Sequence, residues 1–345
     1  MGSPELGVAV VGCGRAGMVH ARNFAAGVGG AALVALADSS AEALAAAGRE
    51  LDCPRTYAAW ADAIADEAVQ AVVVAAPTEV HKDVVIAAAR AGKHVLCEKP
   101  MALRAADGEA MIQAADRARA KLQVGFMRRF DKTFLAAKEA IERGDIGQVV
   151  CVKSLTRGPS VPKRWQCDVA KSAGPLAEVS SHDIDTVRWL TGSEFREVYA
   201  IAGNYRCPDV RAEFPDFYDN VLLVASMENG MQGLVEGAVS VRYGYDARVE
   251  VVGTRGALFV GGPGGGRLAV ASEAAGRGQP VVRSWRELFA EAYAAEAADF
   301  VACVREDRPP RAGGRDGLAA VRVVEAGNRS IRSGRPVRLT PAEAV

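Results

Sequence analysis

Residues 7–17 read GVAVVGCGRAG, and this stretch decides the fold of the first part of the chain. An apolar run leads into a GxGxxG motif at 12–17, and helix-forming residues follow. In a turn between a strand and a helix, the first glycine permits a tight bend and the second lets the backbone approach a pyrophosphate, while the third lets the helix pack closely on the strand. The helix start supplies N–H donors and partial positive charge. The residues of this turn expected to bind a dinucleotide are Gly12, Gly14, Arg15, Ala16 and Gly17.

The region around this motif alternates short apolar runs with alanine-rich helical stretches. The predicted strands are Gly7–Val11, Ala32–Ala37, Ala71–Ala75, His94–Glu98 and Gln123–Gly125. Parallel neighbours need a long connection, and a helix supplies it. The pattern therefore predicts an α/β domain over residues 1–124, an N-terminal Rossmann doubly wound parallel sheet.

The character of the sequence changes after residue 125. The predicted strands there are Gln148–Leu155, Glu197–Tyr205, Asn220–Met227, Gly233–Val241 and Arg248–Val252, with one helix near 176–191 and two terminal helices, Tyr293–Val304 and Gly317–Ser333. Strands a few residues apart favour antiparallel pairing. We expect residues 125–345 to form a C-terminal α+β domain for substrate binding and oligomerisation. Its large, mostly antiparallel sheet is open on one face, and its terminal helices are able to pack back on the first domain. The glycine-rich stretch 261–267 (GGPGGGR) lacks the Lys-Ser/Thr of a phosphate-binding loop and favours a hairpin.

Composition excludes several classes of partner. The 345 residues carry 42 basic and 42 acidic side chains, so no basic surface for nucleic acid is implied. No uncharged run reaches the roughly 18 residues of a membrane span, and no charged leader precedes the first apolar stretch. Seven cysteines occur without a CxxC pair or a nearby histidine at metal-ligand spacing, which indicates reduced thiols and no metal site. We therefore expect a cytoplasmic protein that contacts neither membrane nor nucleic acid.

Asp38 ends the second predicted strand, 21 residues after Gly17. A carboxylate at this place accepts hydrogen bonds from the adenosine ribose hydroxyls and repels a 2′-phosphate. The position predicts NAD as cofactor, with NADP less favoured. The alternative is that Asp38 only caps the helix that follows at Ser39 or Ser40.

Lys99 follows the fourth predicted strand within CEKP, at the carboxyl edge of the sheet where ligands of open α/β sheets bind. Pro100 fixes the chain after it and is able to do so as a cis peptide. Near the positive charge of a nicotinamide ring, a lysine should have a lowered pKa and relay a proton. The alternative is a surface lysine that ends a strand.

Glu178, His182 and Asp185 have the spacing i, i+4 and i+7, which places them on one face of a continuous helix. An imidazole flanked by carboxylates suits the removal of a proton from an alcohol. Among the four histidines, only His182 belongs to the second domain. A polar stripe that faces water is the alternative interpretation.

Two weaker features concern substrate contacts. In GFMRRFD, paired arginines follow the last strand of the first domain, and one of the pair, Arg129, is able to bind substrate while the other pairs with a carboxylate. Tyr243 and Tyr245 in VRYGYD are two residues apart, so on a strand they share a face and either line a pocket or pack.

Taken together, these strings resemble the Gfo/Idh/MocA family of oxidoreductases, and within it the bacterial inositol 2-dehydrogenases. The matching pieces are GVAVVGCGRAG, AAPTEVH, EKPMAL, GFMRRFD, SSHDIDTVRWLTG, YGYDARVEVVG and DGLAAVRVVEAGNRSIRSGRPVRL. The resemblance implies that Lys99 and His182 carry proton transfer, that Asp185 and Arg129 contact substrate hydroxyls, and that one tyrosine of YGYD closes the pocket. Glu178 is expected to orient the imidazole of His182 or share its charge. It adds to the expected cofactor-binding residues Pro77, Thr78, His81, Glu98 and Lys99.

Two positions depart from the family pattern. Inositol dehydrogenases of the family usually hold an aspartate four residues before the histidine, whereas this chain has Glu178, whose carboxylate reaches about one methylene further. Arg157-Gly158-Pro159 stands where an asparagine is expected to contact inositol. Either the pocket is reshaped or the substrate differs.

The expected activity is NAD-dependent oxidation of a secondary alcohol of a cyclic polyol or sugar to a ketone. Three alternatives stay open: a biosynthetic dehydrogenase of an amino sugar or aminocyclitol, a redox-assisted glycosidase, and a non-enzymatic nucleotide-sensing regulator, which has no need of Lys99 or His182. Lys99 and His182 are expected to converge on the reactive carbon of the cofactor. Because open antiparallel sheets commonly pair across subunits, a homodimer or homotetramer is expected.

Overall fold

The computed structural model describes residues 5–261, 282 and 284–339, and the chain forms two compact units. The first unit comprises residues 1–131 and 290–318, and the second comprises 132–289 and 319–345. Residues 290–318, which the sequence pattern assigned to the second domain, thus belong to the first unit. The glycine-rich stretch 261–267, predicted to form a hairpin, lies outside the described residues except for Gly261.

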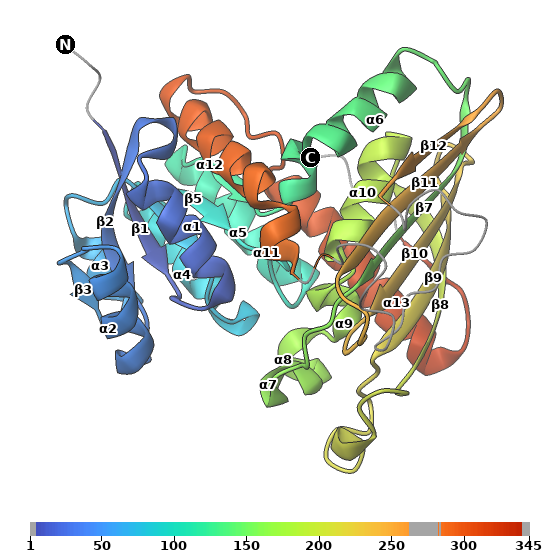
Figure 1. The fold of residues 1–345 in the computed structure, drawn as a ribbon, viewed down its shortest axis with the longest axis horizontal. Helices are drawn as coiled ribbons and strands as arrows, with labels where there is room; N and C mark the ends of the chain where they lie inside the picture. The colour runs from blue at the N-terminus through green and yellow to red at the C-terminus, as the bar shows by residue number, and fades with distance from the viewer. Residues whose placement is uncertain (1–4, 262–281, 283, 340–345) are drawn as a thin grey trace. The chain divides into compact units, whose positions relative to one another are not determined.

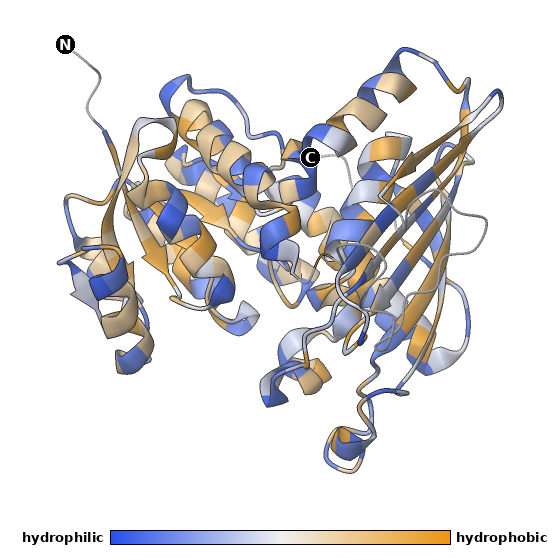
Figure 2. Ribbon diagram, viewed as in Figure 1, coloured by the Kyte–Doolittle hydropathy of each residue, from blue (hydrophilic) through white to orange (hydrophobic). Residues whose placement is uncertain are grey.

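The first unit contains a six-stranded parallel sheet in the order β3-β2-β1-β4-β5-β6 (Figure 1). Its strands are β1 (Leu6–Val11), β2 (Ala31–Ala37), β3 (Thr56–Tyr57), β4 (Ala71–Val74), β5 (His94–Cys97) and β6 (Leu122–Val124). The central strands are apolar along their whole length and buried, as expected for a sheet covered on both faces (Figure 2). The strand order reverses between β1 and β4, and the doubly wound parallel fold is confirmed.

Helices connect these strands and complete the core of the first unit. They are α1 (Arg15–Ala25), η1 (Val28–Gly30), α2 (Ala41–Glu50), α3 (Trp60–Ala65), α4 (Thr78–Arg90), α5 (Ala105–Ala118), η2 (Met127–Phe130) and α12 (Ala290–Arg305). Phe300 and Val301 of α12 pack with Phe24 of α1 and Leu36 of β2 in one buried cluster. Apolar burial of this kind explains why a helix from the end of the chain belongs to the first unit.

The second unit contains a seven-stranded sheet in the order β12-β11-β7-β10-β9-β8-β13. Its strands are β7 (Val149–Arg157), β8 (Phe195–Gly203), β9 (Asn220–Met227), β10 (Gln232–Ala238), β11 (Asp246–Gly253), β12 (Ala257–Val260) and β13 (Val337–Arg338). Every pair is antiparallel except β7 with β10. The mostly antiparallel sheet predicted from the strand spacing is therefore confirmed.

Helices cover one face of this sheet. The helices of the unit are α6 (Lys132–Glu142), α7 (Arg164–Cys167), α8 (Val169–Ser172), α9 (Pro175–Glu178), α10 (Ser181–Thr191), η3 (Pro208–Val210), α11 (Trp285–Leu288) and the later part of α13 (Gly314–Ser333). Val187 of α10 meets β10 at Gly233, where a Cβ atom would lie 3.0 Å from the valine. Ser330 of α13 accepts a hydrogen bond from the N–H of Ala200 on β8.

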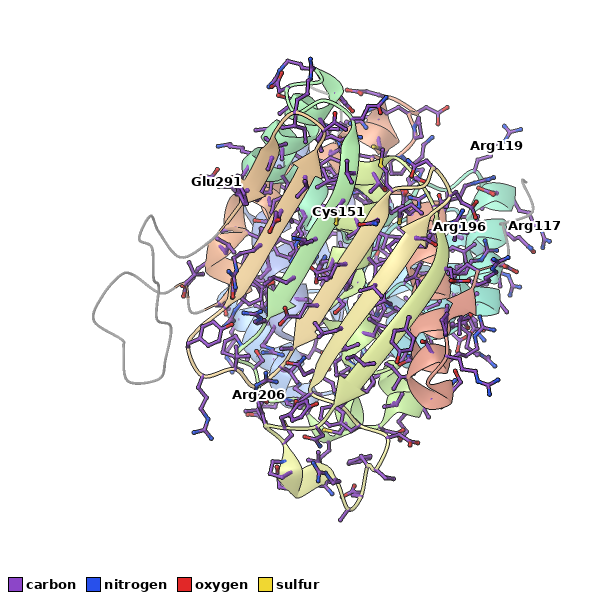
Figure 3. All side chains as sticks on the ribbon, turned by 90° about the vertical axis from the view of Figure 1, so that its right-hand side faces the viewer. Arg117, Arg119, Cys151, Arg196, Arg206 and Glu291 are labelled. Atoms are coloured by element: carbon purple, nitrogen blue, oxygen red, sulfur yellow. The ribbon has the colours of Figure 1, made fainter. Side chains whose placement is uncertain are left out.

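The opposite face of the sheet faces the viewer in Figure 3. Among the described residues, several exposed apolar side chains lie on this face. Tyr199 and Ile201 of β8 lie opposite Val224 and Leu222 of β9 in the strand register. Phe259 of β12 is 73% exposed. Large apolar groups gathered on one exposed face indicate an interaction surface.

No helix among the described residues combines the length and apolarity needed to cross a membrane.

Candidate active site

The turn after β1 gives each glycine a distinct task. Gly12 has φ +98°, and a Cβ there would lie 2.6 Å from the carbonyl oxygen of Ala75. A Cβ on Gly17 would lie 1.7 Å from the carbonyl oxygen of Gly12, so only glycine lets α1 pack on the turn. Around Gly14 nothing lies within 4 Å of such an atom, and this residue is exposed at the start of α1. The open space lies where a pyrophosphate is expected, so the turn fits a dinucleotide.

Asp38 connects this turn to the start of α2 through its two carboxylate oxygens. Oδ2 accepts from the N–H of Cys13 at 2.6 Å, and Oδ1 accepts from the N–H of Ser40 at 2.8 Å. The cap of α2 is Ser40, whose hydroxyl accepts from the N–H of Ala43, so the interpretation of Asp38 as only a helix cap is not the observed arrangement. Asp38 stays partly exposed, and a carboxylate has further lone pairs for ribose hydroxyls.

The Cys13 thiol lies inside this turn. Burial, with smaller contributions from Asp38 and Cys53, raises the pKa of the Cys13 thiol to about 12. The thiol is therefore neutral at physiological pH and acts as a small packing group.

His81 ties two loops of the first unit together. The ring is 1% exposed; its Nε2 lies 2.9 Å from the carbonyl oxygen of Ala76 and its Nδ1 lies 3.1 Å from that of Pro100. Thr78 at the start of α4 is also buried, while Pro77 before it is exposed. His81 thus holds the loop after β4 against the loop after β5, and direct contact between its ring and the cofactor stays a prediction.

Lys99 follows β5 and is partly exposed, with a cis peptide bond to Pro100. Its N–H donates to Oε2 of Glu98 at 3.1 Å. Glu98, predicted to bind the cofactor, is only 4% exposed, and its Oε1 lies 2.9 Å from Nε2 of His20. The carboxylate of Glu98 thus contacts His20 and the main chain of Lys99, and its direct contact with the cofactor stays a prediction.

Arg129 is buried in η2 and bound within the first unit. Its Nη2 donates to Oδ1 of Asp316 at 3.0 Å, and its Nη1 donates to the carbonyl oxygen of Arg311 at 2.9 Å. Asp316 also accepts from the N–H of Gly313 at the start of α13. These contacts give Arg129 a structural task, and its predicted contact with substrate is still a prediction.

In the second unit, Glu178 does not share a continuous helix with His182 and Asp185, so the predicted single helix near 176–191 is wrong at its middle. Helix α9 ends at Glu178 and α10 begins at Ser181. The N–H of Ser180 donates to the carbonyl oxygen of Pro175, five residues back, and the Ser181 hydroxyl donates to that of Ala177. Serine hydroxyls compete with regular helix hydrogen bonds, which explains the interruption.

His182 and Asp185 lie on α10, one turn apart. The two residues are 6% and 2% exposed. Between them, Asp183 is completely buried, and its Oδ1 accepts from the hydroxyl of Ser154 on β7 at 2.6 Å. That hydrogen bond anchors the first turn of α10 to the covered face of the sheet.

Gln166 holds Glu178. The amide Nε2 of Gln166 donates to Oε2 of Glu178 at 3.0 Å, and its Oε1 accepts from the N–H of Lys163. Sequence reasoning missed Gln166, because it lies twelve residues away in a separate short helix and no spacing rule connects the two. His20 was also missed, although its place three residues after Gly17 on the buried side of α1 was a signal.

Tyr243 and Tyr245 do not share a strand, so the prediction that they occupy one face of a strand is wrong. Both precede β11, and Gly244 between them has φ +114°, which breaks the extended alternation. The Tyr243 hydroxyl donates to Oδ2 of Asp246 at 3.2 Å and accepts from Arg157 at 3.4 Å, on the exposed face of the sheet. The Tyr245 ring instead packs edge-on against Phe289, with ring centroids 6.4 Å apart.

The described residues include no group of three or more His, Cys, Asp or Glu side chains suited to a metal ion. What the two units offer is organic acid-base chemistry: a lysine at the sheet edge of one, and a buried imidazole with carboxylates in the other.

Comparison with known proteins matches both parts of the chain to one family. The Gfo/Idh/MocA model for "Oxidoreductase family, NAD-binding Rossmann fold" matches residues 6–126, and the model for "Oxidoreductase family, C-terminal alpha/beta domain" matches residues 138–339. An inositol 2-dehydrogenase of Rhizobium meliloti is 35% identical over 330 residues, which cover 96% of this chain and 98% of the relative.

Two similar solved structures contain a bound cofactor. The scyllo-inositol dehydrogenase of Lactobacillus casei with NAD(H) and scyllo-inositol has a TM-score of 0.85 and 26% identity, and the match covers 97% of this chain and 99% of that one. GenD2 from gentamicin A biosynthesis in complex with NAD has a TM-score of 0.86 and 25% identity, with 98% and 97% covered.

Proposed function

The chain belongs to the Gfo/Idh/MocA family of NAD-dependent oxidoreductases, and on that premise we propose that it oxidises a secondary alcohol of a cyclic polyol, of the myo- or scyllo-inositol type, to a ketone. The observation that carries the proposal is a buried imidazole, His182, one helical turn from the buried carboxylate of Asp185. No other histidine of the sequence lies in the second unit. The full-length similarity to inositol dehydrogenases supports the substrate class.

NAD is the proposed cofactor, in preference to NADP. The exposed start of α1, with open space at Gly14, would receive the pyrophosphate, and Asp38 would accept the ribose hydroxyls. A 2′-phosphate would bring two negative charges toward the Asp38 carboxylate, which raises the free energy of binding. When bound, NAD supplies the hydride acceptor.

Side chains of the protein accept the proton of the substrate hydroxyl and stabilise the charges that develop. His182 takes the proton of the substrate hydroxyl, and the Lys99 ammonium donates a hydrogen bond to the oxygen as negative charge develops on it. Glu178, held by Gln166, stabilises the charged imidazolium, and Asp185 binds a neighbouring hydroxyl. The proton leaves with His182 while two electrons leave the carbinol carbon as hydride, so the alcohol becomes a ketone.

A second candidate substrate is an amino sugar or aminocyclitol. The similarity to GenD2 from gentamicin A biosynthesis supports it. Glu178, in place of the shorter aspartate, and Asp185 would attract an ammonium group near the reacting carbon.

A substrate panel tests the proposal. Purified protein is assayed for NADH formation with inositols, hexoses and aminocyclitols, with NADP in parallel. A cyclic polyol oxidised with the highest kcat/KM supports the first candidate, and an aminocyclitol supports the second. Release of an aglycone from a glycoside without net NADH would instead favour the redox-assisted glycosidase.

Two variants test the residues. Lys99→Ala and His182→Ala are each expected to lower kcat by a factor on the order of 10²–10⁴ with NAD affinity nearly unchanged. His94→Gln is the matched control, since His94 lies at the start of β5 and its Nδ1 accepts from the N–H of Lys121. Turnover like the wild type in either alanine variant would remove that residue from the mechanism.

The proposed assembly is a homodimer or homotetramer in the cytoplasm. The exposed apolar side chains Tyr199, Ile201, Leu222 and Val224 on β8 and β9 support pairing with a second copy, because water is released when such groups are covered.

A further inference from the structure

A cluster of buried polar side chains lies behind the carboxyl end of β5 in the first unit. His20 from α1, Gln123 from β6 and Glu296 from α12 are completely buried, and Glu98 after β5 is 4% exposed. Burying charged groups is costly unless they are paired, so a protein core rarely gathers an imidazole, an amide and two carboxyl groups. The cluster therefore calls for a reason other than packing.

Glu98 links the cluster to Lys99. Its Oε1 meets Nε2 of His20 at 2.9 Å, while its Oε2 accepts the main-chain N–H of Lys99 at 3.1 Å. The ring of Tyr293 from α12 meets His20 edge-on, with centroids 5.4 Å apart, and fixes the imidazole from the other side. A shift of His20 would therefore move Glu98, and a shift of Glu98 would move the main chain of Lys99.

The fold makes room for this carboxylate. A Cβ atom at Gly125, which follows β6, would lie 3.1 Å from both Cδ and Oε2 of Glu98. A Cβ at position 125 would therefore require the Glu98 carboxylate to shift by a few tenths of an ångström. The glycine thus belongs to the same arrangement.

The two carboxyl groups carry different charges. Burial alone would raise the pKa of Glu98, but the hydrogen bond from His20 and the charges of His20 and Lys99 outweigh it and hold that pKa below its usual value. Burial, and then the charges of Glu98 and Asp299, raise the pKa of Glu296 well above its usual value. Neither oxygen of Glu296 has a hydrogen-bond partner within the described part of the chain, which suits a neutral acid.

We propose that His20 and Glu98 are positioning residues for Lys99, and that Glu296 completes their buried cluster as a neutral acid, so that one negative charge stands beside the lysine. Glu98 is thereby reassigned from cofactor binding to the support of a catalytic side chain. The proposal rests on the proposed role of Lys99 in proton transfer.

A double-mutant cycle tests the action through Lys99. Glu98→Gln keeps the shape and removes the charge; it is expected to lower kcat roughly 10-fold to 100-fold with NAD affinity and KM within about twofold. In a Lys99→Ala background the same substitution is expected to change kcat less than about twofold, because its effect passes through the missing lysine. An equal loss of kcat in both backgrounds, or no loss in the first, would overturn the proposal.

His20 is tested by comparing two substitutions. His20→Phe removes the hydrogen bond to Glu98 and is expected to lower kcat as Glu98→Gln does, whereas His20→Gln offers an amide donor and should restore part of the loss. His94→Gln controls for the removal of a histidine from the same unit. If the phenylalanine and glutamine variants have the same kcat, His20 does not act through its hydrogen bond.

A measurement without substrate tests the charge of Glu296. Because the folded-state pKa of Glu296 is raised, its protonated form contributes fully to the free energy of unfolding below the ordinary pKa near 4.5. This contribution is lost as pH rises toward the folded-state pKa. Glu296→Gln lacks this loss, so its urea midpoint should exceed that of the wild type by a margin that grows from pH 5 to pH 8. A constant margin overturns the neutral-acid assignment. An inactive wild type with a growing margin would sink the proposed function and leave the cluster standing.

Discussion

Alanine at Gly14 and at Gly17 should separate the two tasks of the glycine turn. At Gly17 the new Cβ would lie 1.7 Å from the carbonyl oxygen of Gly12, against a practical minimum of 3.0 Å. The start of α1 must therefore move by about 1.3 Å from the turn, the difference between those two distances. Overpacking of this kind costs about 1–3 kcal/mol of the free energy of unfolding. The displaced N–H groups at the start of α1 should also bind the pyrophosphate of NAD more weakly.

At Gly14 the same substitution meets nothing within 4 Å, and the backbone angles, φ −75° and ψ −169°, suit alanine. Alanine is a poorer helix cap than glycine by roughly 0.5–1 kcal/mol, and the lower entropy of the unfolded chain offsets this cost, so stability should stay within about 0.5 kcal/mol. The methyl group would occupy the space of the pyrophosphate. Losing one charge-assisted hydrogen bond, about 1.5–3 kcal/mol, weakens NAD binding roughly 10-fold to 100-fold.

Urea unfolding and calorimetric titration with NAD measure the two effects separately. Gly14→Ala should unfold like the wild type and bind NAD weakly, while Gly17→Ala should lose both stability and binding. The reasoning is refuted if Gly14→Ala binds NAD as the wild type does, or if Gly17→Ala keeps full stability.

Three further outcomes are expected. Asp38→Asn should reduce the preference for NAD over NADP by about tenfold, because the repulsion of the 2′-phosphate is removed; an unchanged ratio of the two dissociation constants would contradict this role. Ile201→Lys should yield smaller assemblies in sedimentation velocity without loss of stability, since it places a charge in the exposed apolar face, and an unchanged mass would exclude that face as the interface. Asp316→Asn should lower the free energy of unfolding by about 3 kcal/mol with little change in KM, because the ion pair of Arg129 with Asp316 is lost; a raised KM at full stability would instead favour a substrate role for Arg129.

The sequence by itself determined the features whose causes lie within a few neighbouring residues. The apolar runs, the helical spacings and the glycine turn each depend on local chemistry, so the parallel sheet, the antiparallel sheet and the close packing at Gly12 and Gly17 were predictable. The two terminal helices were predicted for the same reason. The family could also be recognised from short motifs, because the residues of each motif form one compact local structure.

Only the tertiary structure decided which distant side chains meet. Helix α12 joins the first unit because Phe300 and Val301 find their apolar surroundings there, nearly 300 residues from β1. Gly244 sends the neighbouring tyrosines to different surroundings, and the Glu98 carboxylate meets the imidazole of His20 from another helix. Such partners are selected by burial and by the need to pair every buried charge, and these forces act through the packed core rather than along the chain.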